Sequence, residues 1–442
     1  MKKIFQYIML AVVTIVMASC TSDIEETTAT TGKSNVQLVV GEFPAFGDSQ
    51  TRAIGTPDPG KTSWAEGDEL LLEMTSNTYG TQYATFKYNG NSWELTSGEL
   101  SYKIDEVPTF PHVYYAPNYK WEAGTLVLKE GKVAGTDEYI EGTAQITPNG
   151  EAITIEFSKA TRKYSRLRIA TLPNEQITVD TEYFTPAGSS DMKWDQNYAL
   201  TSDENGNAYL YGTFENNSEV TVKYREAALT THTFSQATES AKSYALDATV
   251  ISANSAEEIK SAIKQKVADG KTTIRLNLAP NAGTDEFMAI REAIKGAAPN
   301  DEGTIELTII GVETIPEEAF KRMSQLKSVK MPDVKEIKKY AFSECRYLTV
   351  VEAPSLNKLN SGAFNECYLL SKLTFGPINY ADARYWPIFE DITPNIDLIL
   401  SDYQKEMIET DDDLYTANND IDYADSNKHW NKNFLGGGCP KT

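Results

Sequence analysis

The sequence is poor in cysteine, with four among 442 residues, at Cys20, Cys345, Cys367 and Cys439. None forms a C-x-x-C pair, and none is spaced with histidine as zinc ligands usually are. Cys20 directly follows the leader described below, and the three others are an odd number. A full disulfide framework is therefore not expected.

Histidine is scarcer still, with three residues, His112, His232 and His429, far apart in the chain. Ser-His-Asp triads assemble in space, so spacing alone does not rule one out. Three scattered histidines are nevertheless better explained as surface or packing residues. We therefore expect a protein that is not an enzyme, with no catalytic residues, no cofactor and no metal site.

Positive charge is also in short supply. Lys and Arg number 41 against 63 Asp and Glu, which gives a formal net charge of −22. Nucleic acids and anionic lipid headgroups are repelled by so acidic a surface, and no basic cluster offsets it locally. We expect no nucleic-acid partner. The length allows two to four domains.

Long hydrophobic runs are missing beyond the first residues, so no later segment is predicted to cross a bilayer. The start combines the basic Met1–Lys3 with the apolar run Ile8–Met17 and small residues after it. This pattern is typical of a secretory signal, here residues 1–19. A short membrane anchor is the alternative.

The end of that signal, Met17-Ala18-Ser19-Cys20, resembles the lipobox of bacterial lipoproteins. Ser22–Glu26 resembles the acidic export tag of Bacteroidetes surface lipoproteins. The resemblance implies cleavage before Cys20, lipidation of Cys20 and a surface-exposed place at the outer membrane. Residues 20–35 are then predicted to be a flexible tether, because they are mostly small and polar without periodicity.

One string matches a motif of nucleotide chemistry. Gly55–Thr62, GTPDPGKT, fits the phosphate-binding pattern G-x-x-x-x-G-K-[ST]. A true P-loop joins a buried strand to a helix, but polar residues precede this string and Gly67 would interrupt a helix soon after it. Pro57 and Pro59 also remove two backbone donors. We predict a plain loop with Lys61 at the surface, and no nucleotide partner.

Short strands with turn signals fill residues 36–250, and no stretch there has helical periodicity over a helix length. Ala84–Tyr88 and the residues after Ser92 flank an Asn89-Gly90 turn, which predicts a hairpin with positive φ in the turn. This pattern predicts β-sandwich architecture, which we divide at Pro148–Gly150 into residues 36–147 and 148–250. Other expected strands are Val36–Val40, Gly124–Val133, Gln145–Phe157, Arg166–Leu172, Tyr209–Phe214 and Val220–Tyr224.

This half of the chain resembles the fimbrillin family of Bacteroidetes, which includes the subunits of surface pili and related lipoproteins. The strings that carry the resemblance are Thr51–Ala53, Thr62–Asp68, Val113–Pro117, Ile155–Thr161 and Leu167–Ile169. Two departures leave the subfamily open: Ala-Pro follows the tyrosine pair where many members have Tyr-Pro-Tyr, and Ser158 stands where many have His.

The resemblance implies fimbrillin-like β-sandwiches and a maturation cut by an arginine-specific protease. The cut would fall between Arg52 and Ala53 and release the strand Val36–Val40. A neighbouring subunit's strand would then fill the vacated groove. The alternative is that Arg52 lies in an exposed loop and is not cut.

The pattern changes after residue 250. Ser255-x-x-Glu258 is a capping box that predicts a helix over 256–268. A strand over 272–278, a helix over 284–296 and a strand over 304–310 are expected to follow. We expect residues 251–312 to form an α/β cap for the segment that comes next.

Residues 313–375 repeat with a period of 22. Ala-Phe pairs and leucines recur in register, at Ala319-Phe320, Ala341-Phe342, Ala363-Phe364, Leu326, Leu348 and Leu370. A fixed period in this range indicates stacked units that bury their apolar edges on one another. The pattern resembles the BspA-type leucine-rich repeats, which implies a short α/β solenoid.

Cys345 and Cys367 occupy one position of this repeat, and Met323 occupies it in the first unit. Because methionine is apolar, the position is predicted to be a buried ladder of free thiols. A disulfide between the two cysteines is the alternative.

The period fades after Gly376, so residues 376–442 are expected to form a C-terminal cap and an acidic tail, with a last strand over Asn395–Leu400. Thr410–Asp425 is rich in carboxylates. It lacks the Gly at position six and the Glu at position twelve of an EF-hand loop. A solvated acidic loop is favoured over a calcium site.

Function is expected to lie on the exposed side of the repeated strands, as in other repeat proteins. The outward positions of these strands are Ser328, Lys330, Val350, Glu352, Lys372 and Thr374. The alternative is that they are ordinary exposed strand residues with no binding role. The expected function is an adhesin, or an accessory or terminal component of fimbriae, with fimbrial subunits and an unknown protein or glycan as partners. The alternative is a stand-alone surface lipoprotein that binds a glycan or host protein and is unrelated to pili.

Overall fold

The structure is a computed structural model, and it describes most of the chain between residues 37 and 376. The described residues are 37–46, 60–103, 106–147, 152–158, 162–225, 227–253, 255–298, 300–376, 380–381 and 397–399. Several predicted features lie outside them. These are the signal, Cys20, the tether, Arg52 and Ala53, the acidic segment Thr410–Asp425, His429 and Cys439.

The first part of the chain forms a seven-stranded sheet. Its strand order is β1 (Gln37–Val40), β9 (Ala152–Glu156), β8 (Ile140–Ile146), β5 (Thr109–Tyr115), β2 (Glu69–Ser76), β3 (Gly80–Tyr88) and β4 (Trp93–Gly98). All neighbours are antiparallel except β1 and β9, which run parallel. The predicted hairpin is confirmed as β3 and β4, and Gly90 between them has a φ of 94°.

Strand β2 is apolar on both faces, which explains its unbroken run of leucines. Leu70 and Leu72 point into the core of the first sheet, whereas Leu71 packs on Ala116 and Tyr119. The hairpin of β6 (Tyr119–Glu122) and β7 (Thr125–Leu128) supplies that outer cover. The strand expected over 124–133 is therefore shorter than predicted, because the chain turns after Leu128 through Gly131, whose φ is 72°.

A second seven-stranded sheet follows. Its path is β15 (Ala227–Thr233), β14 (Glu219–Tyr224), β11 (Gln176–Pro186), β13 (Asn207–Phe214), β10 (Ser165–Ala170) and β16 (Ser243–Asp247), and β12 (Lys193–Thr201) pairs with β11. The predicted division at Pro148–Gly150 was wrong. Ile146 and Ile153 on either side of it pair within the β8–β9 hairpin, so the first sheet continues to Glu156.

The last part of the chain forms two parallel sheets. One has the order β17 (Ile251–Ser252), β18 (Thr273–Asn277), β19 (Ile305–Ile310), β21 (Leu326–Lys330), β23 (Val350–Ala353), β25 (Lys372–Phe375) and β27 (Asp397–Ile399). We call this the repeat sheet. The other is short, with β20 (Thr314–Ile315), β22 (Glu336–Ile337), β24 (Lys358–Leu359) and β26 (Tyr380–Ala381).

Two helices precede the repeated strands, as the sequence predicts. They are α1 (Ala256–Ala268), whose N-cap Ser255 accepts a hydrogen bond from the backbone of Glu258, and α2 (Thr284–Ala297). Neither helix of the described residues is long and apolar enough to cross a membrane. The predicted boundary at 312 is not a structural break, because β19 pairs directly with β21 in the repeat sheet.

The repeat is visible in packing and in the backbone. Phe320, Phe342 and Phe364 stack with ring centroids 5.2 and 5.3 Å apart. Cys345 and Cys367 are both free and fully buried, which confirms the predicted thiol ladder over the disulfide. Each thiol donates to the carbonyl of a phenylalanine in the preceding unit, with Sγ–O distances of 3.0 and 3.1 Å.

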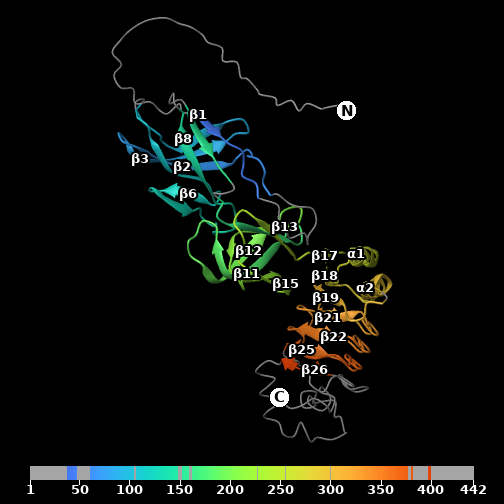
Figure 1. Ribbon diagram of the computed structural model, residues 1–442. Coiled ribbons are helices and arrows are strands. Elements are labelled where there is room, and N and C mark those ends of the chain that lie inside the picture. Colours follow the sequence, from blue (N-terminus) through green and yellow to red (C-terminus); the bar gives the residue numbers. More distant parts are fainter. Residues whose placement is uncertain are drawn as a thin grey trace, which may run out of the picture.

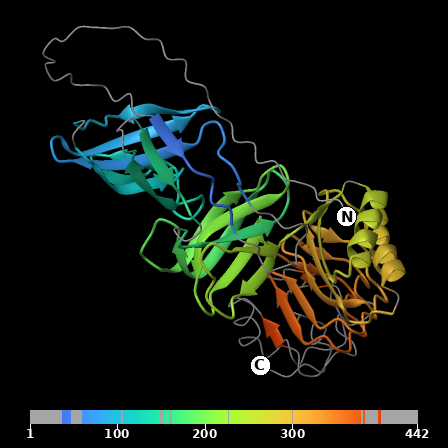
Figure 2. The same cartoon turned by 45° about the horizontal axis from the view of Figure 1, so that its top comes forward.

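The three main sheets follow one another along the molecule, with the second sheet between the first and the repeat sheet (Figures 1 and 2). The first two are joined where Tyr211 donates its backbone N–H to the carbonyl of Gly135. The second sheet meets the repeats where Ile310 enters its apolar core. Strand β15 therefore lies beside the first strands of the repeat sheet (Figure 1).

Candidate functional site

The six predicted binding residues lie together on one face of the repeat sheet. They form two rows across β21, β23 and β25. The first row joins Ser328, Val350 and Lys372 as direct register partners, and the second joins Lys330, Glu352 and Thr374.

All six side chains are half-buried, whereas the residues between them on each strand are buried in the core of the repeats. This alternation follows from the strand period of two. The stacked cores beneath hold the rows in place, because each repeated phenylalanine and thiol contacts its neighbour unit. The result is a rigid polar face with one apolar residue, Val350.

The same face continues onto two earlier strands that were not predicted to belong to it. Glu306 and Thr308 of β19 are register partners of Ser328 and Lys330. Thr273 of β18 pairs in turn with Glu306. The signal for β19 was present in the sequence, because 306 and 308 are 22 residues before 328 and 330.

Ion pairs cross the face between strands. Lys330 Nζ lies 3.3 Å from a carboxylate oxygen of Glu352, and Lys327 Nζ lies 2.8 Å from one of Glu306. The four side chains are 34 to 51% exposed to water, so each pair contributes little to stability, about 0 to 1 kcal/mol. They fix the positions of the charged groups on the face.

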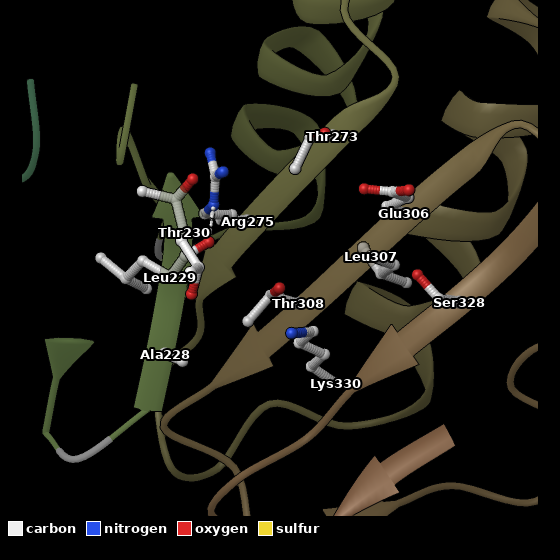
Figure 3. A pocket seen from close by; sticks show the side chains of 11 residues that line it. Ala228, Leu229, Thr230, Thr273, Arg275, Glu306, Leu307, Thr308, Ser328 and Lys330 are labelled. Atoms are coloured by element: carbon white, nitrogen blue, oxygen red, sulfur yellow. Dashed lines mark hydrogen bonds between the residues drawn. The ribbon is translucent and has the colours of Figure 1, made fainter. Parts of the chain in front are cut away.

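A cavity of about 280 Å³ lies where this face meets strand β15 of the second sheet (Figure 3). From the repeat sheet, alternate residues of β18 and β21 and three consecutive residues of β19 line it, so that sheet forms one wall. The lining residues are Thr273, Arg275, Glu306, Leu307, Thr308, Ser328, Lys330 and, from β15, Ala228, Leu229, Thr230 and Thr231.

Arg275 connects the two walls of this cavity. Its Nε donates a hydrogen bond of 2.6 Å to the backbone carbonyl of Leu229 (Figure 3). Its guanidinium lies 4.0 Å from Asp247. The side chain is 7% exposed, and this burial lowers the pKa of Arg275 from its ordinary value. The repeat sheet is thereby fastened to the edge of the second sheet.

The other predicted or rejected sites are placed as follows. Thr62 leads into strand β2 and not into a helix, which agrees with the rejection of the P-loop. Lys61 was wrongly predicted to be a surface residue, since it is paired with Asp68 and bonded to Tyr115.

His112 and His232 are exposed on different sheets. Among the described residues, no group of three or more His, Cys, Asp or Glu could hold a metal ion.

Comparison with known families finds a match to the BspA type leucine-rich repeat region, with six copies over residues 304–385. The match begins at β19, which agrees with the continuous repeat sheet, and it extends the three units counted in the sequence at both ends. A repeat region of this type suggests a protein-binding or adhesin-like role. The likeness of the first half to fimbrillins stays a prediction.

Among solved structures, the crystal structure of the leucine-rich repeat protein of T. pallidum is similar, with 18% sequence identity and a TM-score of 0.18. The similarity covers 22% of this chain and 53% of that one, so about half of the relative's length is matched. No curated protein matched the chain. The structure is mainly β, and the family match identifies a BspA-type leucine-rich repeat region in it.

Proposed function

We propose that this chain is a non-enzymatic adhesin of the cell surface, anchored in the outer membrane through a lipid at Cys20, and that it binds a protein partner with the polar face of its repeats. The observation that carries the proposal is the alignment of six residues in two rows on one face of the repeat sheet. Stacked repeats of this kind form a solenoid whose exposed strand residues are available for binding.

The first half of the chain fits the proposed fimbrillin-like β-sandwiches. Strand β1, which a cut after Arg52 would release, is an edge strand of the first sheet and pairs only with β9 in the described residues. Leu38, Phe43 and Phe46 of the same segment are buried in the core of that sheet. Removal of this segment would open an apolar groove beside β9, as strand donation requires.

The other end of this half argues against a subunit that propagates a fibre. Strand β16 is already paired with β10 in its own sheet. Ala248 donates its backbone N–H to Ala170, and β17 of the repeat sheet begins at Ile251. A strand held at both ends in this way is not free for donation to a neighbour. The proposed place in fimbriae is therefore a terminal or accessory one, and a stand-alone adhesin is the alternative that the same observation favours.

The test is binding of the full-length chain to protein and glycan arrays, with two arginines introduced on the face. Val350→Arg and Thr374→Arg are both half-buried positions on the face and lie outside the lining of the cavity. The matched control is Thr314→Arg, a half-buried position on the short parallel sheet. We expect the wild type and the control to bind the same protein spots and the double variant to lose them. Equal binding by all three would contradict the proposal.

A further inference from the structure

Strand β15 is the free edge of the second sheet, and the cavity lies against that edge. Within the described residues the strand order of this sheet ends at β15, which pairs only with β14. Four consecutive residues, Ala228 to Thr231, line the cavity. Because successive side chains of a strand point to opposite faces, a run of four in a strand that ends its sheet places the cavity along the strand's edge.

The direction of the backbone groups on β15 follows from its pairing. Phe234 exchanges hydrogen bonds with Asn217 and Ser218, so its N–H and C=O point toward β14. In an antiparallel pair these directions alternate, so Thr231 and Thr233 point their N–H and C=O away from β14. Thr231 and Thr221, opposite each other, have their hydroxyl oxygens 2.9 Å apart, as the close spacing of a non-hydrogen-bonded pair allows.

One outward group on this edge is already in use. A register shift near Val222 makes Leu229 the extra residue of a bulge, and its carbonyl accepts the hydrogen bond from Arg275. At this end of the edge, the outward carbonyl is therefore already bonded to a donor of the repeat sheet. Beyond it, the outward backbone groups of Thr231 and Thr233 continue the edge, and both residues are exposed.

Taken together, these features point to one kind of occupant. We propose that an extended peptide segment of a protein partner adds to the edge of β15 as a further strand, with its side chains against the polar face of the repeat sheet. The inference deepens the proposed function and rests on it, because Ser328 and Lys330 of the binding face also line the cavity.

The charge of the cavity favours an acidic side chain on this peptide. Glu306 is paired with Lys327 at 2.8 Å, whereas the guanidinium of Arg275 is 4.0 Å from Asp247. The cavity thus contains a buried cation whose counter-ion Asp247 is 4.0 Å away and whose other acidic neighbour, Glu306, is already paired with Lys327. A carboxylate of the peptide would complete its hydrogen bonds and its charge.

Strand addition depends on backbone groups, which gives it a sharp test. Thr231→Pro removes an outward N–H and leaves the ladder to β14 intact, because proline is tolerated on the free side of an edge strand. Thr233→Pro removes the next outward N–H along the same strand. Thr231→Ala is the matched control, since it shortens the side chain but keeps the backbone N–H.

The full-length chain would be screened with a display library of short random peptides, and the selected peptides would be measured against each variant. We expect acidic extended sequences, a loss of affinity of about tenfold or more in each proline variant, and a clearly smaller loss in Thr231→Ala. Hydrogen exchange should show new protection of the Thr231 and Thr233 amides on peptide binding. Melting curves close to wild type would show that both proline variants are folded.

The outcomes separate this inference from the proposed function. If the proline variants bind as the wild type does while Val350→Arg with Thr374→Arg abolishes binding, strand addition is refuted and the adhesive face stands. If no peptide is selected from the library, or if the amides gain no protection, strand addition is likewise refuted. If the proline variants lose the peptides and the arginine variant keeps them, strand addition holds and the wider face is not the binding surface.

Discussion

Lys61 Nζ lies 2.8 Å from the hydroxyl oxygen of Tyr115, which in turn donates a hydrogen bond of 3.1 Å to Asp68. Lys61 is also ion-paired with Asp68 directly. The lysine of the GTPDPGKT string therefore closes a network inside the first sheet. Burial and the charge of Asp68 raise the pKa of Tyr115, so this phenol stays protonated and remains a donor.

We expect Lys61→Ala to destabilise the protein by about 1 to 2 kcal/mol, because Asp68 loses its cation and Tyr115 loses a donor in a half-buried place. Chemical denaturation measures this loss. Neither the wild type nor this variant should bind nucleotide. Lys87→Ala, at an exposed position of the neighbouring strand β3, is the control and should change stability by less than about 0.5 kcal/mol. Micromolar binding of ATP that disappears in Lys61→Ala would overturn the interpretation.

The thiol ladder should respond to alkaline pH. Burial raises the pKa of Cys345 to about 12, against an ordinary value of 9.0. The folded protein thus holds this proton more tightly than the unfolded chain does. Its contribution to stability is complete below pH 9 and is lost as the pH rises from 9 toward 12.

Denaturation curves across that range should therefore fall less steeply for Cys345→Ala than for the wild type. At neutral pH the Cys345→Ala and Cys367→Ala variants should each lose about 1 to 2 kcal/mol, since the two sites are equivalent in the stack. Neither thiol should react with iodoacetamide until the protein unfolds. A 345–367 disulfide in the mass spectrum of non-reduced protein would contradict the ladder.

Arg162 and Glu138 form an ion pair that is almost completely buried. Arg162 also donates to the carbonyl of Pro44 at 2.7 Å and lies 3.7 Å from the centre of the Phe46 ring. Glu138→Ala should cost about 3 to 5 kcal/mol, because it leaves the guanidinium buried without its counter-ion. The double variant Arg162→Met with Glu138→Leu should recover most of that loss. A double variant as unstable as the single one would show that the bonds of Arg162 to the N-terminal segment matter more than its charge.

Cleavage after Arg52 should leave the protein monomeric, or at most in short complexes. Strand β16 is held between its own sheet and the repeats, so it is not free for donation. Light scattering and electron microscopy of protein cut by an arginine-specific protease measure this outcome, with Arg52→Gln as the uncut control. Long homopolymers after the cut would show that the repeats do not prevent strand donation.

The repeats were the most predictable part of the fold. Their period of 22 is enough to place the phenylalanines, the thiols and the two outward rows in register, because identical units must form identical contacts. Helices α1 and α2 were found from capping and periodicity. The repeat period also extends back to β19, since Leu307 pairs with Val329, which lies 22 residues later. This earlier start was missed because α2 and the loop after it interrupt the periodic pattern in the sequence.

The sheets of the first half were less predictable. The Pro-Asn-Gly string at 148–150 was interpreted as a boundary, yet the strands on either side of it pair as a hairpin, because a turn signal is the same inside a sheet and between two sheets. The parallel pairing of β1 with β9 joins residues more than a hundred positions apart. The cavity could not be predicted, because it forms only where β15 and the repeat sheet meet in space. No local sequence pattern around Arg275 indicates that it bonds to Leu229.

The identical contacts between repeats also bear on how this chain can change. The rings of Phe320, Phe342 and Phe364 are separated by nearly the same distance from one unit to the next. If a 22-residue unit were duplicated or deleted, the units on either side could therefore pack through the same contacts. The junction with β15 lies at the first strands of the stack and would be untouched by such an event. Descendants of this gene can therefore lengthen or shorten the polar face of the repeat sheet by whole units, while the edge at Thr231 and the arginine beside it are inherited unchanged.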